Sequence, residues 1–210
     1  MPVSESKDCD LIFYTNPQSR GQIVRWMLEE VGAEYQQVIL EYGGSMKDSD
    51  YLKINAMGKV PAIKHNDKVV TECAAICAYL ADAFPDAQLA PANSDRADYY
   101  RWLFFASGPL EAAITNRSLQ IDVKPEQERM VGYGNYNQVL DVLSERLLSS
   151  EYIAGNQFTA ADVYVGSHVG WGLLFGTMEM RPGFKEYAGR LMEREAFKAA
   201  KAIDMALMES

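Results

Sequence analysis

Apolar and polar residues alternate in short patches along the first 85 or so residues, as they do in a mixed α/β unit. Four β-prone runs are bounded by turn residues and cover residues 11–14, 34–40, 60–65 and 68–71. Three stretches with apolar residues at helical spacing lie among them, over residues 23–31, 46–54 and 76–84. The predicted order is βαβαββα, a three-layer arrangement built on one mixed sheet.

Beyond residue 90 the pattern is helical almost throughout. Long helices are expected over residues 95–118, 125–149, 159–176 and 183–207. The stretch between Phe84 and Asp95 contains two prolines and a helix-start signal, which is typical of a linker. The expected division is an α/β domain, a linker and an all-helical domain, over residues 1–85, 86–94 and 95–210. Residues 1–9 are expected to form an irregular extension of the first domain.

The third of the predicted long helices has a specific start signal. Thr159 precedes Asp162 by three residues and follows the aromatic Phe158. This spacing is typical of a capping box with a hydrophobic staple, in which the two side chains satisfy backbone N–H groups at the helix start. We therefore interpret the motif as a helix nucleation site.

Composition narrows the class of protein. The chain has 210 residues, 20 of them Lys or Arg and 29 Asp or Glu, so its formal net charge is −9. That charge argues against a nucleic-acid partner. The longest apolar stretch, residues 163–176, is too short to span a membrane, and the N-terminus lacks the pattern of a signal peptide. With 3 cysteines and 2 histidines at no metal-ligand spacing, we expect no metal site and a cytoplasmic location.

The Val60-Pro61 pair is the first candidate binding feature. A proline at the start of a strand removes one hydrogen-bond donor from the sheet. If the peptide bond is cis, the N–H and C=O of Val60 face solvent and can pair with an extended peptide ligand. A trans proline at a strand start is the alternative interpretation.

A second feature lies where the last strand of the sheet becomes a helix, at Thr71-Glu72-Cys73. Helix N-termini present unpaired N–H groups and partial positive charge, so a ligand carboxylate can bind there. Glu72 would bind an adjacent ammonium group, and the two groups together are the amino-acid end of a γ-glutamyl peptide. Alternatively, Thr71 caps the helix and Glu72 only complements its dipole.

The turn after the first strand is the third feature. Tyr14, Asn16, Gln18 and Ser19 place hydroxyl and amide groups at the carboxyl end of a strand, where open α/β sheets bind ligands. Ser19 with Gln22 also fits a capping box, and the two interpretations are compatible.

In this order, the three features resemble the cytosolic glutathione transferases, in particular members of bacterial type. The first 85 or so residues are similar to the thioredoxin-like domain of that family and the rest to its all-helical domain. The matching residues are Ser19-Arg20, the segment 55–61, Thr71-Glu72-Cys73 with Ala75-Ile76 and Tyr79-Leu80, and the segment 158–162. The resemblance implies glutathione as co-substrate, no permanently bound cofactor, a homodimer and a detoxification role.

The resemblance also implies which residues bind glutathione. Val60, next to Pro61, would pair through its backbone with the cysteinyl unit, and Glu72 with Cys73 would hold the γ-glutamyl end. Further candidates are Lys59 near the peptide, Lys47 for the glycyl carboxylate and Arg20 as a source of positive potential.

Cys73 departs from the family pattern, which usually has serine at this position. A thiol is a weaker hydrogen-bond donor than a hydroxyl, so we expect glutathione binding to survive but to be weaker. We also hypothesise that the helix N-terminus lowers the pKa of the Cys73 thiol and makes it reactive.

The family's chemistry requires an ionised glutathione thiol. Lowering a thiol pKa of about 8.5 by about two units takes roughly 2.7 kcal/mol, which a few hydrogen bonds and a helix dipole can supply. The turn holds no cysteine, so a cysteine-type mechanism at this position is excluded. Ser19 is the first candidate donor to the thiolate, and Asn16, Gln18 and Tyr14 are the alternatives.

Aromatic residues of the helical half are candidates for a pocket that holds the electrophile. They are Tyr99, Tyr100, Trp102, Phe104, Phe105, Trp171 and Phe175, of which we select Tyr99, Trp102, Phe105 and Trp171. A stripe of aromatic residues also fits a helix core. The expected function is the addition of glutathione to a small hydrophobic electrophile. A glutathione-dependent disulfide reductase or peroxidase and a non-catalytic glutathione-binding scaffold are the alternatives.

Overall fold

The computed structural model describes residues 10–209, so the expected extension over residues 1–9 lies outside the described part. The strands are β1 (Leu11–Thr15), β2 (Gln36–Ile39), β3 (Ala62–His65) and β4 (Lys68–Thr71). They form one sheet in the order β2-β1-β3-β4, with β1 and β2 parallel and the other pairs antiparallel. The predicted mixed sheet is therefore confirmed, and β3 and β4 form a hairpin that turns at Asn66 and Asp67.

Helices cover both faces of this sheet. The helices α1 (Gly21–Val31) and α3 (Cys73–Ala83) lie side by side against one face, and their apolar residues join Phe13 and Ile63 in the main core. The short α2 (Ser49–Leu52) covers the other face through a small cluster that includes Tyr51. Gly32 ends α1 with φ +64°, in the left-handed region where a residue without Cβ is unstrained.

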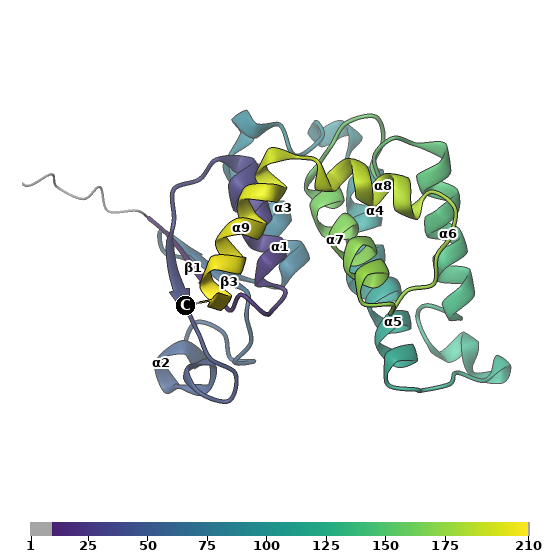
Figure 1. Cartoon of the computed structure of the whole chain (residues 1–210), viewed down its shortest axis with the longest axis horizontal. Coiled ribbons are helices and arrows are strands. Elements are labelled where there is room, and N and C mark those ends of the chain that lie inside the picture. Colours follow the sequence, from purple (N-terminus) through teal and green to yellow (C-terminus); the bar gives the residue numbers. More distant parts are fainter. Residues whose placement is uncertain (1–9, 210) are drawn as a thin grey trace, which may run out of the picture.

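The rest of the chain is helical (Figure 1). Its α-helices are α4 (Ala97–Phe105), α5 (Glu111–Ser118), α6 (Tyr136–Ser149), α7 (Ala160–Leu174), α8 (Phe184–Met192) and α9 (Glu195–Glu209). Short 3-10 turns cover Ser45–Lys47, Pro85–Ala87, Asn93–Asp95 and Pro125–Met130. A π-helical turn at Ala106–Leu110 joins α4 to α5, so the predicted helix over 95–118 is nearly continuous. No helix among residues 10–209 is long and apolar enough to cross a membrane.

Two predicted helix boundaries are wrong. The helix expected over 125–149 starts at Tyr136, because Gly132 and Gly134 interrupt it and Asn135 caps the later helix by accepting the N–H of Gln138 at 2.9 Å. The helix expected over 183–207 is two helices, α8 and α9. The chain turns between them, which carries α9 back alongside α1 (Figure 1).

The contact between α9 and α1 is built around a buried ion pair. The guanidinium of Arg25 lies 2.8 Å from the carboxylate of Asp204, and both side chains are almost fully buried. Beside it, Trp26 packs edge-on against Phe197 with ring centres 5.0 Å apart. Arg194 adds a bidentate ion pair to Glu30, at 2.6 and 2.7 Å. These contacts fix the helical half against α1.

The start of α7 confirms the predicted capping box. The side chains of Thr159 and Asp162 each accept the hydrogen bonds that the motif requires. Asp162 is fully buried and also accepts the N–H of Ile153 at 2.7 Å and the hydroxyl of Tyr187 at 2.9 Å. Burial raises the pKa of this carboxyl to about 6, because its effect is larger than that of the hydrogen bonds, which lower the pKa. Asp162 thus joins α7 to the loop before it and to α8.

Candidate functional site

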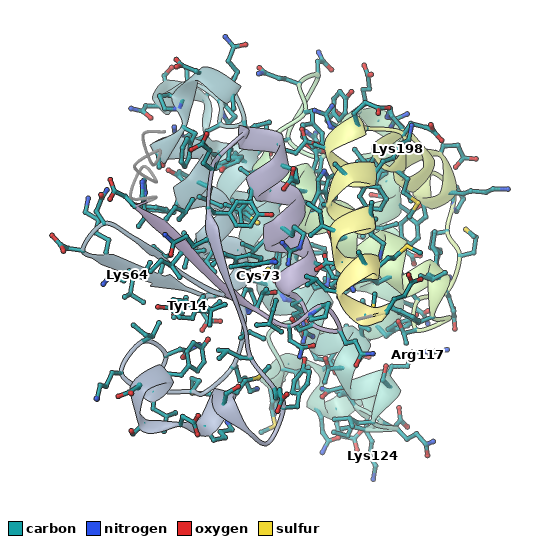
Figure 2. The ribbon with its side chains drawn as sticks, turned by 60° about the vertical axis from the view of Figure 1, so that its left-hand side comes forward. Tyr14, Lys64, Cys73, Arg117, Lys124 and Lys198 are labelled. Atoms are coloured by element: carbon teal, nitrogen blue, oxygen red, sulfur yellow. The ribbon has the colours of Figure 1, made fainter. Side chains whose placement is uncertain are left out.

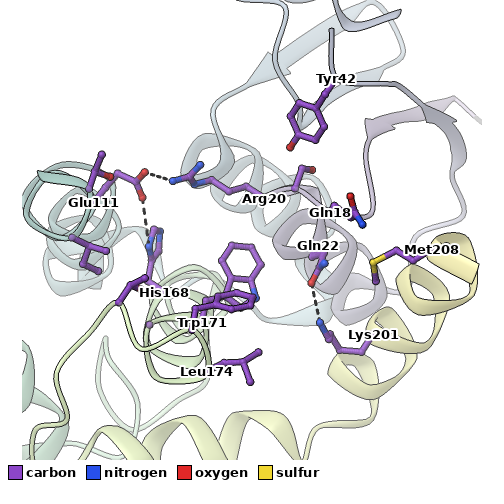
Figure 3. Close-up of a pocket in the computed structure, with 16 residues that line it drawn as sticks. Gln18, Arg20, Gln22, Tyr42, Glu111, His168, Trp171, Leu174, Lys201 and Met208 are labelled. Atoms are coloured by element: carbon purple, nitrogen blue, oxygen red, sulfur yellow. Dashed lines mark hydrogen bonds and ion pairs between the residues drawn. The ribbon is translucent and has the colours of Figure 1, made fainter. Parts of the chain in front are cut away.

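Two cavities of about 570 Å³ each lie on either side of the start of α1. We call the first the strand-edge cavity; it is lined by residues 59–61, residues 72–75, Arg20, Asn55, Met57, Phe104, Ser107, Glu111 and Tyr164. We call the second the interhelical cavity, because α1, α5, α7 and α9 surround it. Its polar lining residues include Gln18, Ser19, Arg20, Gln22, Glu111, His168 and Lys201 (Figure 3). Arg20 and Glu111 line both cavities, so the two cavities meet at these side chains.

Val60 has the free backbone groups that the sequence suggested. The Val60–Pro61 peptide bond is cis. Within residues 10–209, neither the N–H nor the C=O of Val60 has a hydrogen-bond partner. The preceding carbonyl, that of Lys59, is held by the hydroxyl of Tyr51 at 2.6 Å and by the amide of Asn55 at 2.8 Å. The strand edge at Val60 is thus presented to the cavity by a fixed loop.

Asn55 begins the segment 55–61 but was not a candidate site residue from the sequence. Its side chain also accepts the N–H of Met57 at 3.0 Å, so one buried amide holds the whole turn. An asparagine followed by a glycine-containing turn is the signal that could have identified it. Lys59 lines the cavity as expected. Lys47 does not line either cavity; its ammonium donates to the carbonyls of Met57 and Gly58, at 3.1 and 2.9 Å.

Glu72 stands between β4 and α3 with its side chain exposed at the strand-edge cavity. Its φ is +67°, a backbone conformation that costs a non-glycine residue about 1 kcal/mol or more. No side chain caps α3, so the alternative in which Thr71 is the cap is wrong. The surrounding structure holds Glu72 in this conformation, in which its carboxylate and the first N–H groups of α3 lie at one end of the cavity.

Cys73 lines the same cavity but is buried. Its thiol donates to the carbonyl of Arg20, with sulfur and oxygen 3.6 Å apart. Burial raises the pKa of this thiol well above its ordinary value, and the neighbouring Cys77 raises it further. The hypothesis of a lowered pKa is therefore wrong, because the loss of hydration outweighs the effect of the helix N-terminus.

The four candidate donors of the first turn separate into two pairs. Ser19 and Gln18 line the interhelical cavity, whereas Tyr14 and Asn16 line neither. Tyr14 packs on the face of the sheet that α2 covers, with its ring centre 5.5 Å from that of Tyr51. Figure 2 labels Tyr14.

Asn16 holds the turn rather than facing a cavity. Its amide donates to the carbonyl of Leu40 at 2.8 Å, and its side-chain oxygen accepts the N–H of Gln18 at 2.9 Å. The Ser19 hydroxyl donates to the carbonyl of Asn16 at 2.7 Å and accepts the N–H of Gly21 at 2.9 Å. A Cβ on Gly21 would lie 2.0 Å from Oγ1 of Thr15, so α1 can start this close to β1 only with glycine there.

An ion pair between Arg20 and Glu111 occupies the junction of the two cavities (Figure 3). Both side chains are partly exposed, and the backbone N–H of Arg20 has no partner among the described residues. Glu111 was not a candidate from the sequence. It lies on α5, 91 residues after Arg20, and no local motif marks it.

His168 lies beside this ion pair and lines the interhelical cavity. Its Nδ1 is 3.6 Å from a carboxylate oxygen of Glu111, and its ring stands edge-on to Tyr164 with centres 4.7 Å apart. Burial lowers the pKa of His168 to about 4, and the positive charge of Arg20 contributes to the decrease. The ring is thus neutral at pH 7.

The burial of His168 predicts that the free energy of unfolding depends on pH. Because the pKa of His168 is lower in the folded chain than the ordinary 6.5, its contribution to stability is complete above about pH 6.5 and is lost as the pH falls through about 4. The decrease should approach about 3 kcal/mol. Urea unfolding at a series of pH values should show it in the wild type and not in His168→Gln. A His65→Gln control should keep it; equal pH dependence in all three proteins would contradict the assignment.

The structure places the aromatic candidates in two different environments. Tyr99 and Trp102 are buried in the core, and Phe105 packs edge-on against Trp102; none of the three lines either cavity. Their face of α4 points to the other helices, whereas Phe104, on the opposite face, is exposed and lines the strand-edge cavity. Trp171 does line the interhelical cavity.

Known proteins that resemble this chain in sequence and in structure identify its family. The family model described as "Glutathione S-transferase, N-terminal domain" matches residues 9–82. Glutathione S-transferase 2 of Schizosaccharomyces pombe is 29% identical over 86% of this chain and 83% of its own length. A probable glutathione S-transferase of Oryza sativa, GSTF2, is 31% identical over 68% of this chain and 70% of its own length. A sphingomonad glutathione S-transferase solved with glutathione superposes with a TM-score of 0.72 at 28% identity, covering 92% of this chain and 98% of the other. The chain therefore belongs to the glutathione S-transferase family of enzymes.

Proposed function

We propose that this chain ionises the thiol of glutathione and adds the thiolate to a small hydrophobic electrophile. The observation that carries the proposal is the meeting of two cavities at the start of α1. One has the features of a peptide site and the other has apolar walls. A thiol placed at Arg20 would have the peptide that carries it on one side and its reaction partner on the other.

The strand-edge cavity supports the placement of glutathione. The unpaired N–H and C=O of Val60 match the backbone of the cysteinyl unit, as an added strand would. The γ-glutamyl carboxylate would accept from the first N–H groups of α3, and its ammonium would pair with Glu72. Lys59, which lines this cavity, would add positive charge near the peptide.

The start of α1 supports thiolate formation. Three sources of stabilisation lie there: the free N–H of Arg20, its guanidinium, and the Ser19 hydroxyl, whose proton would rotate from the carbonyl of Asn16 to the sulfur. Together with the helix dipole, they are of the size needed for the roughly 2.7 kcal/mol that a two-unit decrease in thiol pKa requires. No general base is needed.

The Arg20–Glu111 pair provides the test. Arg20→Gln should lower kcat/KM for conjugation of chlorodinitrobenzene about tenfold at pH 6.5 and move the pH profile up by about one unit, because one cation near the thiolate is lost. It also leaves Glu111 unpaired beside the sulfur. A second substitution, Glu111→Gln, should therefore recover part of the loss.

The pKa of the bound glutathione thiol is measured from the ultraviolet absorbance of its thiolate. Ser19→Ala should raise this pKa, as Arg20→Gln does.

The alternatives predict different results. If hydroxyethyl disulfide is reduced and chlorodinitrobenzene is not conjugated, the protein is a disulfide reductase and the proposal fails. If glutathione binds with its thiol pKa unchanged and neither substrate reacts, the protein is a binding module.

A further inference from the structure

The interhelical cavity contains a cation, Lys201, whose hydrogen-bond partner is a neutral side chain. The ammonium of Lys201, on α9, donates to the side-chain oxygen of Gln22 at 2.9 Å (Figure 3). Within residues 10–209 it has no carboxylate within ion-pair distance. The side chain is partly buried and lines the cavity. Since an ammonium has three N–H donors, two of them are available to a ligand.

The charges around Lys201 leave a net positive site. Asp204, one helical turn further along α9, is nearly fully buried and is already paired with Arg25 at 2.8 Å. These three residues together carry a net charge of +1. At the other end of the cavity, Arg20 is neutralised by Glu111. In a chain of net charge −9, Lys201 is thus a cation with no ion-pair partner among the described residues, and it lies in the pocket next to the expected reaction centre.

The rest of the cavity is shaped for a flat apolar body. Trp171, Phe175 and Ile114 contribute apolar side chains, and Figure 3 shows Trp171 between Arg20 and the Lys201–Gln22 pair. Ser19 lies two residues before α1 and is joined to Gln22 by a turn, in which the N–H of Gln22 donates to the carbonyl of Ser19 at 3.2 Å. Their Cα atoms are therefore about 5 Å apart. A reactive carbon at Ser19 and an anionic group at Lys201 would be separated by about the length of one para-substituted ring.

We propose that the electrophile is an aromatic carboxylate, bound through its carboxylate by Lys201 and Gln22. The inference rests on the proposed transferase function and specifies its second substrate. For an aryl chloride, the glutathione thiolate attacks the ring carbon, the C–S bond forms, the C–Cl bond breaks, and chloride leaves with the bonding electron pair. The carboxylate is unchanged and serves only as the anchor.

A matched pair of electrophiles tests the proposal: 4-chloro-3-nitrobenzoate and its neutral carboxamide. Each kcat/KM is divided by the uncatalysed rate constant, because the two rings differ in intrinsic reactivity. The wild type should prefer the carboxylate about tenfold. Lys201→Met should remove that preference and Lys201→Glu should reverse it.

Lys198→Met is the control, since Lys198 lies one turn earlier on α9 and is paired with Glu193 and Glu195 at the surface. It should keep the wild-type preference. Calorimetry with 4-methyl-3-nitrobenzoate, which cannot react, measures the same subsite without catalysis and should show about tenfold weaker binding to Lys201→Met.

The possible failures are distinguishable. If both electrophiles react equally well, or if Lys201→Met slows both equally, the carboxylate subsite is refuted and the transferase function stands. If Lys201→Met instead raises the KM for glutathione, Lys201 belongs to the glutathione site and the inference is wrong. If neither electrophile reacts and chlorodinitrobenzene also does not, the proposed function fails; the calorimetric comparison then decides the subsite on its own.

Discussion

Replacement of Glu72 by glutamine should raise the KM for glutathione by roughly 30-fold and leave kcat nearly unchanged. The Glu72 carboxylate is exposed at the strand-edge cavity and has no ion-pair partner among residues 10–209, so it is available to the γ-glutamyl ammonium. A charged hydrogen bond contributes about 1.5–3 kcal/mol, a factor of about 10 to 100 in affinity. Glutamine keeps the size of the side chain, removes its charge and turns one acceptor oxygen into a donor. Steady-state kinetics with glutathione as the varied substrate measures the effect.

An altered ligand makes this test specific. Glutaryl-cysteinylglycine is glutathione without its amino group, so it should bind the wild type about as weakly as glutathione binds the Glu72→Gln protein. Glu72→Gln should then not weaken its binding further. Glu145→Gln, at an exposed position on α6, is the control and should behave as wild type. If removal of the amino group and of the carboxylate have independent, additive effects, Glu72 does not contact the ammonium.

Replacement of Asp162 by alanine should lower the free energy of unfolding by about 4 kcal/mol. The fully buried carboxylate accepts the N–H groups of Ile153 and Thr159, at 2.7 and 2.9 Å, and the hydroxyl of Tyr187 at 2.9 Å. Alanine would leave these buried donors without partners, each at a cost of about 1–3 kcal/mol, and would also remove a helix cap. Equilibrium unfolding in guanidinium chloride measures the loss.

Two further variants show whether the loss comes from these hydrogen bonds. Asp162→Asn keeps the side-chain volume but turns one acceptor into a donor, so it should be destabilised by an intermediate amount. Asp86→Ala, at an exposed position, should change stability by less than about 0.5 kcal/mol. A loss below about 1 kcal/mol in Asp162→Ala would show that water replaces the carboxylate.

Much of the fold could be predicted because its signals are local. The end of α1 at Gly32 and the capping box at Thr159 each depend on residues within one helical turn. The two wrong helix boundaries depend on distant contacts or weak signals. The break between α8 and α9 lets Arg194 and Asp204 reach α1, and nothing in the local sequence reports that contact.

In the candidate site, too, the residues marked by local motifs could be predicted and those brought in by distant helices could not. Val60 and Glu72 were found because a short motif marks each of them, although the burial that raises the pKa of Cys73 could not be seen in the motif. Glu111, His168 and Lys201 come from helices far along the chain and meet α1 only after the helical half has packed. The choice between Phe104 and Phe105 depended on the rotation of α4, which is set by the helices around it.

The buried pairing of Arg25 with Asp204 has a consequence for the order of events during synthesis. The ribosome makes α1 early and α9 last among the described helices. Until α9 leaves the exit tunnel, Arg25 has no counter-ion, and burying an uncompensated guanidinium is costly. The face of α1 that carries Arg25 therefore stays exposed to solvent until α9 packs against it. The interhelical cavity, which α9 lines through Lys201 and Met208, is therefore complete only after α9, the last of the described helices, has packed against α1.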